Sequence, residues 1–122
     1  MKNRALIIED DEKNRMLEKD LLEKAGFEVL EAASGAEGIS LAQRERPDVI
    51  VMDLRLPDMR GDLVAKRLRQ ENETCDIPII FVTASVIGEM MVGASSIPNT
   101  KLLTKPINTR TFGEDVARCV KG

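Results

Sequence analysis

Five side chains that could do chemistry together stand directly after short apolar runs of the sequence. They comprise two adjacent carboxylates, a third carboxylate, a hydroxyl and an amine, namely Glu9, Asp10, Asp53, Thr83 and Lys105. A short unbroken apolar run is typical of a strand buried on both faces, as in a parallel sheet. Because ligands bind outside the carboxyl ends of parallel strands, we expect these side chains to share one edge of a sheet.

Carboxylates gathered at one edge would repel each other. Two of them about 4 Å apart cost about 4 kcal/mol at an effective dielectric constant near 20. A hard cation among oxygen ligands removes this cost, and Mg²⁺ held by one or two carboxylates, water and phosphate is the usual solution. Lys105 and Thr83 would add a positive charge and a hydroxyl donor for an anion at the metal. The set therefore predicts phosphoryl transfer with Asp53 as the acceptor.

Strand and helix patterns alternate along the chain and would position these side chains. Such alternation favours an α/β fold with right-handed crossovers, a parallel sheet and helices on both faces. The strands are expected at 5–8, 28–32, 49–52, 79–82 and 101–104, the second being more polar and so nearer an edge. The helices are expected after residue 11 up to Gly26, at 34–46, from Gly61 onward and at 109–120. Their core-facing residues should be Met16, Leu17, Leu21, Leu22, Ala25, Ile39, Leu41, Ala42, Leu63, Val64, Ala65, Leu68, Phe112, Val116, Ala117 and Val120.

The segment 86–100, between the fourth and fifth strands, fits a helix poorly. It contains two glycines, two serines and Pro98. Glycine costs about 1 kcal/mol in a helix interior and proline about 3 kcal/mol. We therefore expect a short or irregular helix of at most two turns, at 86–92, followed by a loop.

Composition narrows the class of protein. The 122 residues should form one domain, 1–122, and 32% of them are charged, with a net charge of −3. This charge and the scarcity of aromatic residues argue against direct binding of nucleic acid. No apolar run approaches the roughly 20 residues that span a membrane. With no histidine and no metal-type spacing, Cys75 and Cys119 are expected to be reduced thiols in a cytoplasmic protein.

Four sequence motifs, taken together and in order, resemble the receiver domain of two-component response regulators. They are Leu6-Ile7-Ile8-Glu9-Asp10-Asp11, Met52-Asp53-Leu54-Arg55-Leu56-Pro57 with Gly61, Val82-Thr83-Ala84, and Leu103-Thr104-Lys105-Pro106. Each motif is weak alone, but together they cover essentially the whole chain. The resemblance implies a doubly wound, flavodoxin-like fold with five parallel strands in the order 2-1-3-4-5.

The resemblance also implies roles for individual residues. Asp53 would be phosphorylated by a sensor histidine kinase or a histidine phosphotransfer protein, and the domain would be a signalling switch rather than an enzyme acting on a separate substrate. Asp10 would lie nearest Mg²⁺, with Glu9 as its acidic neighbour and the backbone carbonyl of Arg55 as a further ligand.

Further implications concern the two residues opposite these carboxylates. Lys105 would hold the phosphoryl oxygens and Thr83 would move towards them. The peptide bond between Lys105 and Pro106 would be cis. An effector protein or domain would bind the face formed by the fourth helix, the fifth strand and the fifth helix.

Three other functions compete with this interpretation. A phosphatase with an Asp nucleophile would want a second Asp two residues after Asp10, where the chain has Glu12. A flavodoxin-like cofactor binder needs a phosphate loop after the first strand, where this chain places four carboxylates. A degenerate receiver that serves only for docking would not need the complete set of site residues. Nearby acidic residues have simpler roles: Asp11 and Glu12 in the first turn of a helix, Asp58 and Asp62 in turns and caps.

Two departures from the family pattern concern the output of the switch. Leu102 stands where the family commonly has an aromatic residue, and 95–100 lacks the usual Gly-Ala turn. Ring burial therefore cannot report phosphorylation here, and we expect the stretch 87–98 to become ordered, or to dock a partner, when Asp53 is modified.

Overall fold

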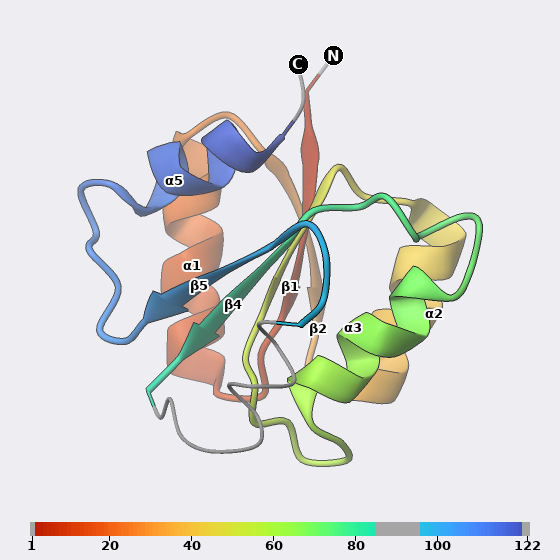
Figure 1. The fold of residues 1–122 in the computed structure, drawn as a ribbon. Helices are drawn as coiled ribbons and strands as arrows, with labels where there is room; N and C mark the ends of the chain where they lie inside the picture. The colour runs from red at the N-terminus through yellow and green to blue at the C-terminus, as the bar shows by residue number, and fades with distance from the viewer. Residues whose placement is uncertain (1, 85–95, 121–122) are drawn as a thin grey trace.

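A computed structural model describes residues 2–84 and 96–120 and shows a parallel sheet between two layers of helices (Figure 1). The five strands lie in the order β2-β1-β3-β4-β5, so the predicted doubly wound architecture is confirmed. In chain order the elements are β1 (Arg4–Ile8), α1 (Glu12–Lys24), β2 (Glu28–Ala32), α2 (Gly35–Glu45), β3 (Val49–Met52), α3 (Gly61–Arg69), β4 (Ile79–Thr83), β5 (Thr100–Thr104) and α5 (Phe112–Cys119).

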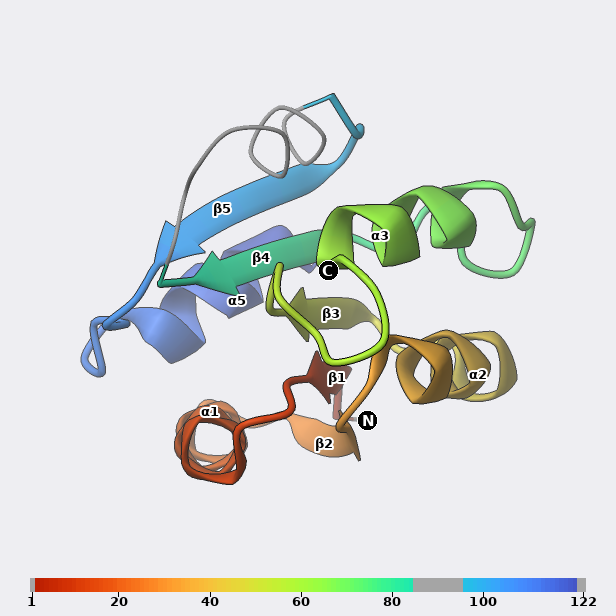
Figure 2. The same ribbon diagram turned by 90° about the horizontal axis from the view of Figure 1, so that it is seen from below.

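The sheet separates two apolar clusters. Side chains alternate between faces along each strand, so Leu6 and Ile8 of β1 pack with α2 and α3, whereas Ala5 and Ile7 pack with α1 and α5. The view along the sheet shows these helix pairs on opposite sides of it (Figure 2). The central strands β1, β3 and β4 are almost entirely buried, and polar β2 lies at one edge, as its sequence predicts.

Helix α1 turns a different face to the core from the one predicted. Met16 and Leu17 are 60% and 41% exposed, and Ala25 is also exposed, so these three predictions are wrong. The buried residues are Glu18 and Leu22, which are four positions apart and therefore lie one above the other on the helix. Met16 is about 200° around the helix from residue 18, and so it faces away from the sheet.

Similar corrections apply to α3 and α5. Leu63 is 45% exposed, and Ala117 is exposed, although both were predicted to face the core. The last helix begins at Phe112 rather than at residue 109, because the side chain of Asn108 accepts a hydrogen bond from the Arg110 N–H and forms a turn there. The other predicted boundaries hold to within one or two residues.

The short helix expected at 86–92 lies outside the described residues, as does most of the stretch 87–98. Of the neighbouring residues that are described, Ile97 is buried against the cluster shared by α2 and α3, and Leu102 packs against the same cluster. Both cysteines are free thiols, as predicted.

Candidate functional site

The register of the sheet brings the predicted site residues to one edge. Ile8 of β1 pairs with Met52 of β3, so the residues that follow them, Glu9 and Asp53, leave the sheet side by side. The Asp53 N–H donates to the Ile8 carbonyl over 3.1 Å. At the other strands Thr83 pairs with Thr104, and the N–H of the next residue, Lys105, donates to the Thr83 carbonyl over 2.8 Å.

The ammonium group of Lys105 joins the two carboxylates. Its Nζ lies 2.7 Å from Glu9 Oε1 and 2.8 Å from Asp53 Oδ2, and it donates a hydrogen bond to each. The Glu9 side chain is 2% exposed and the Asp53 side chain 11%. One cation therefore serves two anions, and the three groups together carry a charge of −1 when all are ionised.

Burial and pairing shift the pKa values of this group. Burial raises the pKa of Glu9, which the hydrogen bond from Lys105 opposes, and the charge of Asp53 raises it further. Burial alone would lower the pKa of Lys105, but its hydrogen bonds and charge interactions with Asp53 and Glu9 outweigh burial and raise it. Lys105 thus stays charged, and the two carboxylates retain an excess of negative charge that a further cation would relieve.

The loop after β3 holds the Asp53 carboxylate in place. Its Oδ1 accepts a hydrogen bond from the Arg55 N–H over 3.0 Å. The backbones of Arg55 and Arg60 pair as an isolated antiparallel β-bridge. Gly61 then approaches the strand end so closely that an added Cβ would lie 2.3 Å from the Asp53 carbonyl oxygen. Glycine is required at Gly61 because a side chain there would displace the backbone of the site residue itself.

The remaining predicted residues lie around this group. Asp10 is exposed in the turn between β1 and α1. Asp11, which was predicted in the first turn of this helix, is its N-cap and accepts hydrogen bonds from two backbone N–H groups. Thr83 is buried at the end of β4. The peptide bond between Lys105 and Pro106 is cis, as the resemblance implies.

The donors at this edge fit Mg²⁺ by their chemistry. Within 2–84 and 96–120, no three His, Cys, Asp or Glu side chains lie close enough together to hold a metal ion alone. Mg²⁺ does not need such a cage, because it keeps several waters and uses one or two carboxylates and phosphate oxygens. Asp53 and exposed Asp10 offer hard oxygen donors.

Two acidic residues that were predicted in turns and caps, Asp58 and Asp62, stabilise the surrounding loops through partners that the sequence did not reveal. Asp58 accepts hydrogen bonds from the N–H groups of Gly35 and Ala36 over 2.8 and 2.9 Å, so it caps the start of α2 from a distant loop. Asp62, which is 1% exposed, accepts two hydrogen bonds from the Arg60 guanidinium and is not the N-cap of α3.

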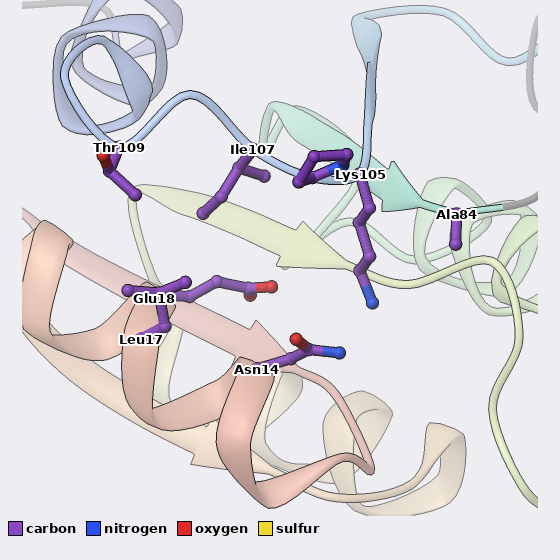
Figure 3. A pocket seen from close by; sticks show the side chains of 8 residues that line it. Asn14, Leu17, Glu18, Ala84, Lys105, Ile107 and Thr109 are labelled. Carbon is purple, nitrogen blue, oxygen red and sulfur yellow. The ribbon is translucent and has the colours of Figure 1, made fainter.

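A cavity of about 410 Å³ lies next to the site, between α1 and the chain that follows β5 (Figure 3). Lys105 and Glu18 both line it. Glu18 is 3% exposed, and burial raises its pKa to about 8, with a smaller contribution from the charges of Glu9 and Asp53. Glu18 was not predicted from the sequence. The available signal was its place four residues before Leu22, in the buried row of the helix.

Comparisons with known proteins show the family of this chain. The family model of the response regulator receiver domain matches residues 5–117. The polar-differentiation response regulator DivK of Brucella anthropi is 42% identical over 84 residues, which are 69% of this chain and 68% of that protein. DivK of Brucella abortus shows the same identity and coverage.

Solved structures show the same fold. The chemotaxis response regulator CheY4 of Vibrio cholerae has a TM-score of 0.89 and 29% identity, covering 98% of this chain and 100% of that one. The receiver domain of the sensor histidine kinase PA1611 from Pseudomonas aeruginosa, solved with a magnesium ion coordinated in its active site cleft, has a TM-score of 0.87 and 25% identity, covering 97% of each chain. With its fold, its charged edge and a family match over nearly its full length, this chain belongs to the response regulator receiver domain family.

Proposed function

We propose that residues 1–122 form one receiver domain that accepts a phosphoryl group on Asp53, with Mg²⁺, in two-component signal transduction. The observation that carries this proposal is the Lys105 ammonium between Glu9 and Asp53, at the carboxyl edge of the sheet. The donor is a phosphohistidine of a sensor histidine kinase or a histidine phosphotransfer protein. The domain itself is a signalling switch.

Each residue would act on the reaction in a definite way. An Asp53 carboxylate oxygen attacks the phosphorus, the P–N bond to the donor imidazole breaks, and an acyl phosphate forms. Lys105 would follow the new charge onto the phosphoryl oxygens, and the Thr83 hydroxyl would donate to one of them. Mg²⁺, when bound, would neutralise charge between carboxylate and phosphoryl oxygens. Asp10, Asp53 and the Arg55 backbone carbonyl would hold it, with Glu9 as their acidic neighbour.

Labelling with a small phosphodonor tests the assignment. Acetyl phosphate and Mg²⁺ should phosphorylate the wild-type protein, while Asp53→Asn should abolish labelling and Asp10→Asn should weaken Mg²⁺ binding sharply. Asp76→Asn is a matched control, because Asp76 is exposed and precedes β4 at the opposite edge of the sheet. Undiminished labelling of Asp53→Asn would remove Asp53 as the acceptor.

Arg55 is proposed to control the lifetime of the phosphoryl group. It lies two residues beyond the acceptor and is exposed, and its N–H already contacts the Asp53 carboxylate. A long cationic side chain there could cover the phosphoryl group and hinder the attacking water. Arg55→Ala should change the rate of dephosphorylation, and identical decay curves for the two proteins would exclude this role. Ser85, the other residue expected to tune this rate, lies outside the described residues.

Output is proposed to pass through the face that includes β5, α5 and the segment before β5. Leu102 is aliphatic and packs into the core, which supports a readout other than the burial of a ring. The proposal is that an effector protein or domain binds this face. Hydrogen exchange of 87–98 with and without beryllofluoride tests it, since equal protection in both states of a protein that binds the mimic would place the switch elsewhere.

The setting of the domain is also a proposal. None of the helices in the described part of the chain has the length and apolar character needed to cross a bilayer. The free thiols of Cys75 and Cys119 support a reducing, cytoplasmic location. The net charge of −3 supports partners that are proteins rather than nucleic acid.

A further inference from the structure

The Glu18 side chain is largely buried, and it lines the cavity together with Lys105. Glu18 is 3% exposed, and within the described residues its side chain makes no hydrogen bond or ion pair. A buried carboxyl without a partner is costly, and native proteins rarely keep one without a reason. Figure 3 shows that this group, on the inner face of α1, points into the cavity beside Lys105 rather than into the apolar core.

The cavity around Glu18 has the build of a small ligand site. Its volume of about 410 Å³ lies within the range of about 300–1,000 Å³ that is usual for small-molecule pockets. Its walls are mostly apolar, and its polar groups besides Glu18 are few. The lining comprises Leu17, Ala84, Pro106 and Ile107 as apolar walls and Asn14, Lys105 and Thr109 as polar groups.

The charges around the cavity favour a cation. Lys105 is the positive group on its wall, but its ammonium is already bound by Glu9 and Asp53. These three groups together leave a charge of −1, and ionised Glu18 would make it −2. A cationic ligand would neutralise part of the excess negative charge and would give the Glu18 carboxylate a partner, whereas an anion would be repelled. The apolar walls favour a cation that is carried on an aliphatic stem.

We propose that this cavity binds an alkylammonium or alkylguanidinium group through the Glu18 carboxylate, with its stem against Leu17 and Ile107. Such a group can come from a free small molecule or from the side chain of a partner protein. The proposed cation site does not require phosphorylation of Asp53, so its test is independent of the test of the proposed function.

Chemical-shift titration of the ¹⁵N-labelled protein tests the proposal. The experiment uses n-butylammonium at pH 8, where Glu18 is about half ionised and an alkylamine stays protonated. We expect shifts at α1 and at residues 105–109 with a dissociation constant on the order of millimolar. Glu18→Gln, which keeps the shape of the side chain, should weaken binding by about tenfold or more, because it removes a charge-assisted hydrogen bond.

Matched controls make the result specific. Glu23→Gln changes an exposed carboxylate on the same helix and should leave binding unchanged. Butanol and butyrate have similar stems without the cation and should bind more weakly. Equal affinity for butanol, equal affinity of Glu18→Gln, or no shift up to roughly 50 mM would overturn the proposal.

A second pair of ligands distinguishes the two sources. Nα-acetyl-lysine N-methylamide carries the same ammonium stem on a peptide backbone. If it binds as well as n-butylammonium, the site admits a lysine of a partner protein. If n-butylammonium binds and the lysine derivative does not, the site takes a free small cation. Both results support the cation site.

Discussion

Replacing Glu18 by glutamine should stabilise the protein at neutral pH. The pKa of this carboxyl is raised from 4.5 to about 8 by burial and by the nearby negative charges. At pH 7 the unfolded chain has the group ionised, whereas the folded protein must take up a proton. Each unit between 4.5 and the pH costs about 1.4 kcal/mol, so the total cost at pH 7 is about 3 kcal/mol. Glutamine is neutral in both states and avoids this cost.

The sign of the pH dependence follows from the raised pKa. The contribution of Glu18 to stability is fully present below pH 4.5, where the group is protonated in both states. It is lost as the pH rises towards 8, because only the folded protein retains the proton in that window. The advantage of Glu18→Gln should therefore vanish near pH 4.5, grow with pH, and level off above about 8.

Urea denaturation of both proteins at several pH values measures this difference. At pH 7 a gain of about 3 kcal/mol corresponds to a rise in melting temperature of roughly 10 °C for a domain of this size. Glu23→Gln serves as the control, since Glu23 is exposed on the same helix. A gain below about 0.5 kcal/mol at pH 7, or a gain that does not depend on pH, would refute the reasoning.

Three further substitutions test other parts of the structure. Lys105→Met should destabilise the folded protein by about 3 kcal/mol at pH 7, because it leaves the buried Glu9 carboxylate unpaired. The loss should be smaller at pH 5, because the pKa of Glu9 is raised and protonation removes its charge. Urea denaturation at the two pH values measures the difference. Gly61→Ala should cost about 1–3 kcal/mol by the same assay and displace the Asp53 resonance, because its Cβ would meet the strand-end backbone. Asp58→Asn should lower the melting temperature above pH 3.8 and have no effect well below it, because capping of α2 lowers the pKa of Asp58 and its stabilisation is lost as the carboxylate protonates.

The strands and their polar ends could be predicted because a parallel sheet leaves little freedom. Apolar runs such as 49–52 are recognisable without any partner, and the carboxyl ends of neighbouring parallel strands coincide. The proximity of Glu9, Asp53 and Lys105 follows from that rule. The same rule does not predict that two carboxylates share one ammonium group, because this sharing depends on the path of the Lys105 side chain after the strand.

The missed features depend on contacts between distant segments. The capping of α2 by Asp58 joins residues 22 and 23 positions apart, and no local pattern announces it. The predicted orientation of α1 is wrong because it places the hydrophobic residues Met16 and Leu17 in the core. Apolar residues are often exposed, and here the helix turns one of its four acidic residues, Glu18, inward.

The carboxylates at this edge compensate their charge in different ways, and this difference determines how the edge would respond to added charge. Glu9 and Asp53 rely on Lys105 and on backbone N–H groups, whereas Glu18 relies on a proton. A phosphoryl group on Asp53 would draw Lys105 towards its oxygens and away from Glu9. The negative potential at Glu18 would then rise, and its carboxyl would hold its proton, or any cation beside it, more tightly. By linkage, a cation in the cavity would in turn favour the phosphorylated state. Glu18 would therefore connect the cavity to the proposed phosphorylation site through charge alone, without a change in the fold.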